Sequence, residues 1–198
     1  MRIFSVLILC LFMGAKCDNK IHSEQSSMVG KTDIKTLYLA RHAKSDWDDS
    51  SLSDFERPLK KRGEKDAPMM GKILHSKGVQ PDLIISSPAK RAISTAYILA
   101  LEMKYPTEKI IANENIYEAS TSELLDIIEQ LDDKLKSVML VGHNPSFTRL
   151  ANYLTEQYFD NIPTCGVVAI AFDVSEWKTI EKNSGKVIFF EYPKKHKK

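Results

Sequence analysis

TLYLARHAKSDW, residues 36–47, is the stretch from which the fold of this chain can be deduced. Its first half is a nearly unbroken apolar run, Leu37 to Ala40, of the kind found in strands that are covered on both faces. Arg41 and His42 follow where such a strand would leave the sheet, which is where α/β proteins place their chemistry. A buried strand fixes both residues, so the guanidinium can hold an anion beside an imidazole able to attack it. The stretch therefore predicts a phosphate site that carries its own nucleophile.

Two later segments repeat this arrangement, in which an apolar strand is followed by a basic residue. In DLIISSPAKRAISTA, Arg91 lies in the first turn of a helix after a second strand, and in VMLVGHNPSF, His143 comes directly after a third. A cation in the first turn of a helix is disfavoured by the helix dipole unless an anion lies nearby, which favours anion binding by Arg91. Taken alone, Arg41-His42 would be an ordinary polar strand end. Since parallel strands end at one edge of a sheet, however, these four residues are expected to converge on one pocket.

An ordered set of motifs resembles the histidine phosphatase superfamily and, within it, the SixA-like phosphohistidine phosphatases. The motifs run from Thr36 to near the C-terminus and read LYLARHAKSDW, DFERPLKKRG, SSPAKRAISTA, IYEAS, LVGHNP and PTCGVVAIAFDV. Ala43 stands where the superfamily most often has the glycine of an Arg-His-Gly motif. Alanine is usual in the SixA-like branch, so the pair Arg41-His42 is intact, but a mutase substrate is not implied.

Phosphoryl transfer develops negative charge on the equatorial oxygens, so a pocket for it needs fixed donors around an in-line nucleophile. We expect His42 to attack through a neutral ring nitrogen and become phosphohistidine, which water then hydrolyses. Arg41 and Arg91 are expected to hold the phosphoryl oxygens, and a protonated His143 to add a further charged donor. This constellation predicts a phosphatase that works in two steps through a covalent phosphohistidine intermediate.

Two further site residues rest on the resemblance. It implies that Glu118 meets the leaving group, as general acid in the first step and general base in the second. It also implies that Arg57 lies near the rim of the site, although an ion pair with Asp54 or Glu56 explains Arg57 equally well. No cofactor and no metal ion is expected, because the sequence contains no closely spaced His/Asp/Glu cluster and the arginines supply positive charge.

Strands and helices alternate along the chain and end in a strand pair, which predicts an α/β fold, a three-layer α/β/α sandwich with a mainly parallel sheet. The resemblance adds the phosphoglycerate mutase-like arrangement with one antiparallel edge strand. Beyond the first strand, we expect strands near 83–85, 109–112, 138–141, 166–172 and 187–192 and helices near 57–78, from 89, from 121 and through 147–154. The hydroxyls of Ser86 and Ser87 are expected to cap the second helix, and Tyr97 and Leu101 to belong to its buried face.

The composition fits one globular domain with an appendage: 198 residues, 43% hydrophobic and 27% charged. A net charge of +2 does not suggest a nucleic-acid partner, and residues 195–198 read as a solvated basic tail. Residues 34–194 would form the phosphatase domain, acting as a monomer on a phosphorylated small molecule or a phosphohistidine protein. Cys165 has no obvious disulfide partner and reads as a buried thiol.

The first residues have the layout of a secretory signal peptide, 1–17, with Arg2 before a short apolar core, and a polar linker follows at 18–33. This layout predicts export to the periplasm or, through a lipid on Cys17, to the envelope. Lys16 stands where a lipobox has a small residue, so the cleavage site stays open. Translation from Met28 is the alternative and would give a cytoplasmic enzyme.

Export favours a small phosphomonoester as substrate, whereas a cytoplasmic chain favours phosphohistidine in a protein. A different class of function, a phospho-ligand binding module without turnover, would use the same arginines. His42 and Glu118 favour catalysis over binding alone. A phosphoglycerate mutase is disfavoured because the chain lacks the long insertions of such enzymes.

Overall fold

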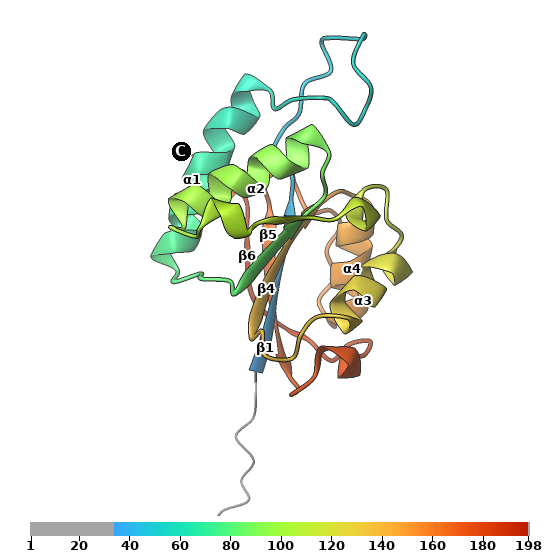
Figure 1. Ribbon diagram of the computed structural model, residues 1–198. Helices are drawn as coiled ribbons and strands as arrows, with labels where there is room; N and C mark the ends of the chain where they lie inside the picture. Colours follow the sequence, from blue (N-terminus) through green and yellow to red (C-terminus); the bar gives the residue numbers. More distant parts are fainter. Residues whose placement is uncertain (1–33, 198) are drawn as a thin grey trace, which may run out of the picture. The chain divides into compact units, whose positions relative to one another are not determined.

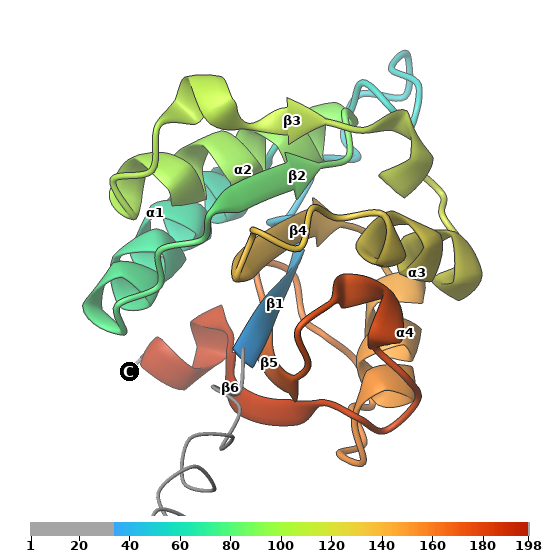
Figure 2. The same cartoon turned by 60° about the horizontal axis from the view of Figure 1, so that its bottom comes forward.

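The computed structural model describes residues 34–197, so the predicted signal peptide and linker, with Cys17 and Met28, lie outside the described residues. Six strands form one sheet in the order β3-β2-β4-β1-β5-β6 (Figures 1 and 2). They are β1 Ile34–Arg41, β2 Leu83–Ser86, β3 Ile111–Ala112, β4 Ser137–Gly142, β5 Val167–Asp173 and β6 Lys186–Glu191. Among the described residues, no helix is long and apolar enough to cross a bilayer.

The helices cover the two faces of this sheet in pairs. Helices α1 Lys61–Ser76 and α2 Lys90–Glu102 lie on one face, and α3 Thr121–Glu129 and α4 Ser146–Leu154 lie on the other (Figure 1). The alternation of side chains along β1 divides the core accordingly, because Leu37 and Leu39 pack with α3 and α4 while Ala40 packs with α1 and α2. Four short 3₁₀ turns complete the fold: η1 Thr107–Lys109, η2 Glu114–Ile116, η3 Trp177–Thr179 and η4 Pro193–His196. The predicted three-layer α/β/α sandwich is confirmed.

The expected position of the antiparallel strand is wrong. Strands β1, β4, β2 and β3 are parallel, whereas β5 pairs antiparallel with both β1 and β6 and therefore lies inside the sheet. The cause lies in the segment after α4, which returns to the carboxyl end of β1 before β5 begins. There the Cys165 N–H donates to the Arg41 carbonyl at 3.1 Å, so β5 starts beside the end of β1 and runs in the opposite direction.

Two predictions for α2 are also wrong. Tyr97 is 47% exposed and Leu101 is 70% exposed, because the helix buries a narrow stripe of small residues that includes Ala92, Ala96 and Ala100. The helix begins without a side-chain cap. The Ser87 hydroxyl instead accepts a hydrogen bond from the Ala89 N–H at 3.3 Å and faces the candidate site.

The basic C-terminal residues are exposed but ion-paired. Lys195 and His196 both contact the carboxylate of Glu191, the latter at 2.7 Å, and Lys197 contacts Asp66 on α1 at 2.5 Å. These contacts attach residues 195–197 to the domain, and the C-terminus accordingly lies beside α1 in Figure 1.

Gly63 allows α1 to pack directly on the backbone that follows β1. A Cβ atom at this position would lie 2.3 Å from the Lys44 carbonyl oxygen, which accepts a hydrogen bond from the Lys60 N–H at 2.8 Å. Neither backbone group can move without displacing the residues next to His42. Gly63 is therefore a packing requirement of the site as well as of the helix.

We predict that Gly63→Ala destabilises the protein, because the clash forces α1 away from residue 44 at a cost of about 1–3 kcal/mol. Thermal unfolding of the variant and of Lys65→Ala, an exposed position on the same helix, measures this effect. The midpoint should fall for Gly63→Ala alone. Equal midpoints for the two variants would contradict the close approach.

Candidate functional site

The backbone at the end of β1 is fixed on both sides. Arg41 is the register partner of Gly142 on β4, and the His42 N–H donates to the Gly142 carbonyl at 3.0 Å. On the other side, the Cys165 N–H donates to the carbonyls of Arg41 and His42 at 3.1 and 3.0 Å. The register also brings His143, the residue after Gly142, beside His42, with 5.1 Å between the ring centroids.

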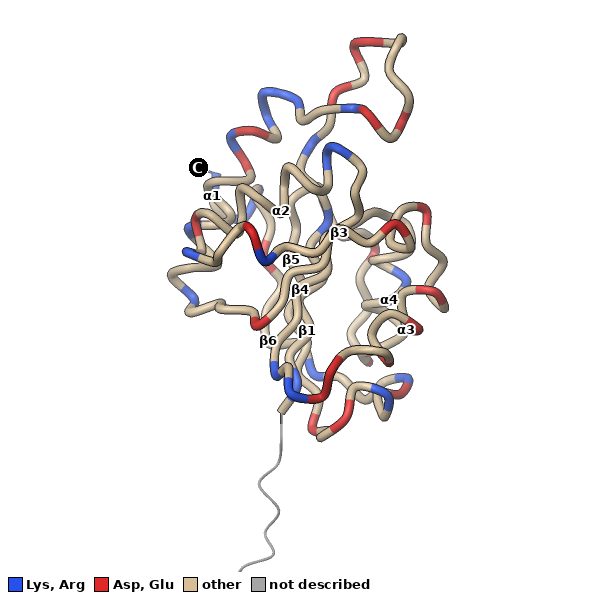
Figure 3. Tube along the Cα trace, in the orientation of Figure 1, with Lys and Arg blue, Asp and Glu red and all other residues tan. Residues whose placement is uncertain are grey.

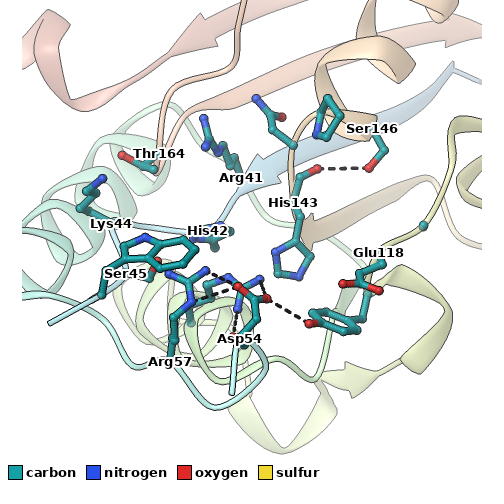
Figure 4. A pocket seen from close by; sticks show the side chains of 16 residues that line it. Arg41, His42, Lys44, Ser45, Asp54, Arg57, Glu118, His143, Ser146 and Thr164 are labelled. Carbon is teal, nitrogen blue, oxygen red and sulfur yellow. Dashed lines mark hydrogen bonds and ion pairs between the residues drawn. The ribbon is translucent and has the colours of Figure 1, made fainter. Parts of the chain in front are cut away.

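A cavity of about 490 Å³ opens at this edge of the sheet (Figure 4). All six residues predicted for the site line it, although they come from five separate segments: Arg41, His42, Arg57, Arg91, Glu118 and His143. The cavity also has lining residues that the sequence did not single out, among them Lys44, Trp47, Asp54, Tyr117 and Asn144. The convergence of the basic residues on one cavity was thus predicted from the sequence, but many of the other lining residues were not.

His42 is held as a neutral imidazole with its proton at a defined nitrogen. Its Nδ1 lies 2.7 Å from the Ala43 carbonyl oxygen, which can only accept, so Nδ1 is the donor and carries the proton. The lone pair of Nε2 is therefore free. Burial lowers the pKa of His42 to about 3, the Ala43 hydrogen bond opposes this, and His143 and the arginines lower the pKa further. At neutral pH the ring is uncharged, and its unprotonated Nε2 is chemically able to act as a nucleophile.

His143 is also neutral in the ligand-free pocket. Burial, followed by the nearby charge of Arg91, lowers the pKa of His143 to about 4. The protonated form requires the additional negative charge of a bound phosphoryl group. Nε2 lies 2.8 Å from the Ser87 hydroxyl, which accepts from the Ala89 N–H and can direct its own hydrogen at Nε2. That arrangement leaves the ring proton on Nδ1, a buried atom without a protein partner.

Arg41 and Arg91 are each held at one end and free along one side. The terminal nitrogens of Arg91 donate to the Asp54 carbonyl at 2.5 Å and to the Asp54 carboxylate at 2.8 Å. Arg41 donates through one terminal nitrogen to the Ile162 carbonyl at 2.8 Å and to Asn161 at 3.3 Å. The Nε of each arginine is buried and has no protein partner. Each guanidinium therefore keeps one N–H group that is not committed to a protein acceptor.

Asp54 orients these donors, although from the sequence it was expected only as a surface ion-pair partner of Arg57. One carboxylate oxygen accepts from Arg57 at 2.6 and 3.0 Å, and the other accepts from Arg91 and from the Tyr117 hydroxyl at 2.8 and 3.0 Å. Burial would raise the pKa of Asp54, but hydrogen bonds from Arg57 and Tyr117 and the charge of Arg91 lower it to about 2. The available signal was the motif DFERPL, which places Asp54 one helical turn before Arg57.

Arg57 lies in the pocket wall with most of its donors already used. Besides its bonds to Asp54, it donates to the Ser45 hydroxyl at 2.8 Å and to the Asp46 carbonyl at 3.4 Å. Its guanidinium carbon lies 3.4 Å from the centroid of the Trp47 ring. Both interpretations of Arg57 thus hold in part: it pairs with Asp54 and lines the site, but it offers fewer free donors than Arg41 or Arg91.

Glu118 lines the same cavity and has an exposed side chain. Figure 4 shows it on the side of His143 away from His42. Its backbone has φ +56°, a left-handed conformation that costs a non-glycine residue about 1–2 kcal/mol. Directly after it, Ser120 caps α3 in a reciprocal capping box with Glu123, which fixes the chain at this point. The fold thus holds an exposed carboxylate among the residues that line the pocket.

Buried polar atoms without partners identify what the pocket can bind. Among residues 34–197, four buried side-chain atoms without a protein hydrogen-bond partner belong to residues that line this cavity: Arg41 Nε, Arg91 Nε, His143 Nδ1 and Asn144 Oδ1. Three of these atoms are nitrogens that can donate a hydrogen bond, which is the kind of group that an oxyanion requires. The same range contains no group of three or more His, Cys, Asp or Glu residues placed to hold a metal ion.

Comparison with known proteins agrees with this chemistry. Residues 37–124 match the family described as the histidine phosphatase superfamily (branch 1). An uncharacterized chloroplastic protein of Arabidopsis thaliana is 31% identical over 159 residues, which cover 76% of this chain and 72% of that protein.

Two solved structures share the fold. One, assigned as a phosphohistidine phosphatase SixA from Agrobacterium tumefaciens, has a TM-score of 0.69 and 25% identity and covers 80% of this chain and 98% of its own. The other, the protein histidine phosphatase SixA with tungstate, has a TM-score of 0.71 and 18% identity and covers 82% and 99%.

We predict that both imidazoles stay neutral in the ligand-free protein down to about pH 5, because their pKa values lie well below the ordinary value of about 6.5. The His42 ring should carry its proton on Nδ1. Two-dimensional ¹H–¹⁵N NMR of the imidazoles during a pH titration distinguishes the tautomers and the charged form. The urea-unfolded protein, in which both rings should titrate near their ordinary pKa, is the control. Protonation of His42 near pH 6 in the folded protein would contradict the prediction.

We also predict that Asp54→Asn weakens inhibition by vanadate about tenfold or more, because hydrogen bonds to charged groups contribute about 1.5–3 kcal/mol and this carboxylate orients Arg91. Vanadate inhibition constants measure the effect. Asp49→Asn is the matched control, since Asp49 is exposed on the same loop and bonds only to Ser51. An unchanged constant for Asp54→Asn would remove Asp54 from the organisation of the pocket.

Proposed function

Because the chain belongs to the histidine phosphatase superfamily, we propose that it is a metal-independent phosphatase whose nucleophile is His42 and whose intermediate is a phosphohistidine. Family membership supports phosphatase activity. The observation that carries the mechanism is the hydrogen bond from His42 Nδ1 to the Ala43 carbonyl, because it leaves Nε2 unprotonated in a pocket of free arginine N–H groups. A nucleophile and oxyanion donors are thus present at one point.

In the first step, His42 Nε2 attacks phosphorus while the bond from phosphorus to the leaving atom breaks. Arg41 and Arg91 donate to the equatorial oxygens through their free Nε–H groups, and His143 donates through Nδ1. The phosphoryl charge raises the pKa of His143, so its second proton arrives together with the anion. Glu118, in its acid form, transfers a proton to the leaving atom.

In the second step, water attacks the phosphohistidine from the position that the leaving group has vacated. Glu118, now a carboxylate, accepts a proton from this water, and inorganic phosphate departs. His42 leaves phosphorus with its proton still on Nδ1, held by Ala43, so the nucleophile returns in the tautomer that began the cycle. Glu118 therefore loses a proton in the first step and regains one in the second, so each step leaves Glu118 in the protonation state that the other step requires.

We propose phosphohistidine in a protein as the substrate. Support comes from the SixA-like motifs and from the phosphohistidine phosphatase assignment of the similar Agrobacterium tumefaciens protein. The leaving atom would then be an imidazole nitrogen, which Glu118 protonates. Small phosphomonoesters would react by the same steps through an oxygen leaving atom.

We predict that His42→Ala abolishes turnover of a small aryl phosphate and of phosphoramidate, because losing a covalent nucleophile removes the whole pathway. Assays are run with and without EDTA, and turnover should be the same in both because the proposed chemistry uses no metal ion. Rapid quenching of the wild type should trap an acid-labile, base-stable phosphoenzyme that is missing in the variant. His75→Ala, on α1 and outside the pocket lining, is the control.

More than about a tenth of the wild-type rate in His42→Ala would exclude His42 as nucleophile. Binding of vanadate without turnover or covalent label in the wild type would indicate a phospho-ligand binding module instead. Turnover that EDTA removes and Mg²⁺ or Zn²⁺ restores would refute the metal-independent mechanism.

A further inference from the structure

A second cavity, of about 680 Å³, adjoins the reaction pocket. Tyr117, Glu118 and Ala119 line both cavities, so these three residues form the boundary that the two cavities share. It lies between β3 and α3, and we call it the acidic groove. Its floor is apolar, with Ile85 and the half-exposed Ile111 among the lining residues.

All the charged side chains that line the acidic groove are negative. Four of its lining residues are carboxylates, namely Glu114, Glu118, Glu123 and Asp126, and none is Lys, Arg or His. The backbone N–H of Ser120 lowers the pKa of Glu123, so this carboxylate stays ionised. Figure 3 shows acidic residues recurring along α3 and the segment before it.

The reaction pocket on the other side of Tyr117 is mainly cationic, because Arg41, Lys44, Arg57 and Arg91 line it against two carboxylates, those of Asp54 and Glu118. A molecule that occupies both cavities therefore needs an anionic phosphoryl group at one end and a neutral or cationic body at the other. A metabolite with a second phosphate or a carboxylate near the leaving atom would place that anion against the four carboxylates. Its binding is disfavoured at distances shorter than the Debye length, about 8 Å at physiological salt.

We propose that the acidic groove binds the polypeptide that flanks the phosphorylated side chain of the substrate, and that this polypeptide carries lysine or arginine beside an apolar residue. The inference rests on the proposed phosphatase function and specifies its substrate class. The apolar floor accommodates an aliphatic side chain, and the carboxylates at the rim pair with basic side chains on either side of it. A small phosphomonoester would leave the groove unused.

The test compares two synthetic phosphohistidine peptides that differ only in having lysine or glutamate on either side of the phosphorylated residue, with phosphoramidate as a probe that cannot reach the groove. In wild-type protein at low salt, the lysine peptide should have a kcat/KM at least about tenfold above the glutamate peptide, because several exposed ion pairs act together. The ratio should fall as salt is added.

Asp126→Lys reverses one charge of the groove outside the reaction pocket, and Glu129→Lys is its matched control, an exposed α3 residue that does not line the groove. Asp126→Lys should lower kcat/KM for the lysine peptide about threefold or more and leave phosphoramidate turnover unchanged. Glu129→Lys should leave the ratio between the peptides as in the wild type.

Equal rates on the two peptides, with phosphoramidate hydrolysed normally, would overturn the docking of a basic polypeptide while the proposed phosphatase function stands. Equal effects of Asp126→Lys and Glu129→Lys would show a general charge effect and would also overturn it. If neither peptide nor phosphoramidate is hydrolysed, the proposed function itself fails, and the inference fails with it.

Discussion

The parallel register of β1 and β4 is the constraint on which the site depends. Pairing Arg41 with Gly142 places the two residues that follow, His42 and His143, side by side at the same edge of the sheet. A shift of one residue would turn every side chain of β1 to the opposite face, so the buried Leu37 and Leu39 hold the register through the core. The energy that fixes the candidate nucleophile thus comes from hydrophobic packing far below it.

Charge is the second constraint, because Arg91 and Arg57 are almost fully buried in the same wall. Two cations without partners could not remain there, and Asp54 offsets both while its second oxygen also accepts from Tyr117. Asp54 accepts hydrogen bonds from the terminal nitrogens of Arg91, so the Nε of Arg91 has no protein partner. Neutralisation and ligand binding therefore use different edges of one guanidinium.

Much of this arrangement could be predicted from the sequence because strand ends are marked by local patterns. An apolar run followed by Arg41, His42 or His143 encodes both the strand and the edge where it ends. The direction of β5 could not be predicted this way, since an apolar run reads the same in either direction. Asp54 was missed for a related reason: it lies in a polar loop, and only the folded chain shows which cations that loop meets.

The buried face of α2 and the charge of His143 depend on distances that no local pattern contains. Tyr97 and Leu101 have the spacing of a core stripe, but Ala92 and Ala96 allow the helix to approach the sheet closely, and this turns the larger residues outward. His143 is polar and lies beside a loop in the sequence, yet in the fold it is buried next to Arg91, and both effects lower its pKa.

The neutrality of the two imidazoles has a consequence for catalysis. A permanently charged His143 would add a third cation beside Arg41 and Arg91, and their mutual repulsion would destabilise the pocket. With a lowered pKa, the ring gains its charge only when an anion is there to hold it, so binding of the phosphoryl group and protonation of His143 favour each other. His42, whose ring is fixed by Ala43 and more deeply buried, stays uncharged and nucleophilic through the same event. Two histidines separated by 5.1 Å can thus take opposite roles, because their surroundings respond differently to one incoming charge.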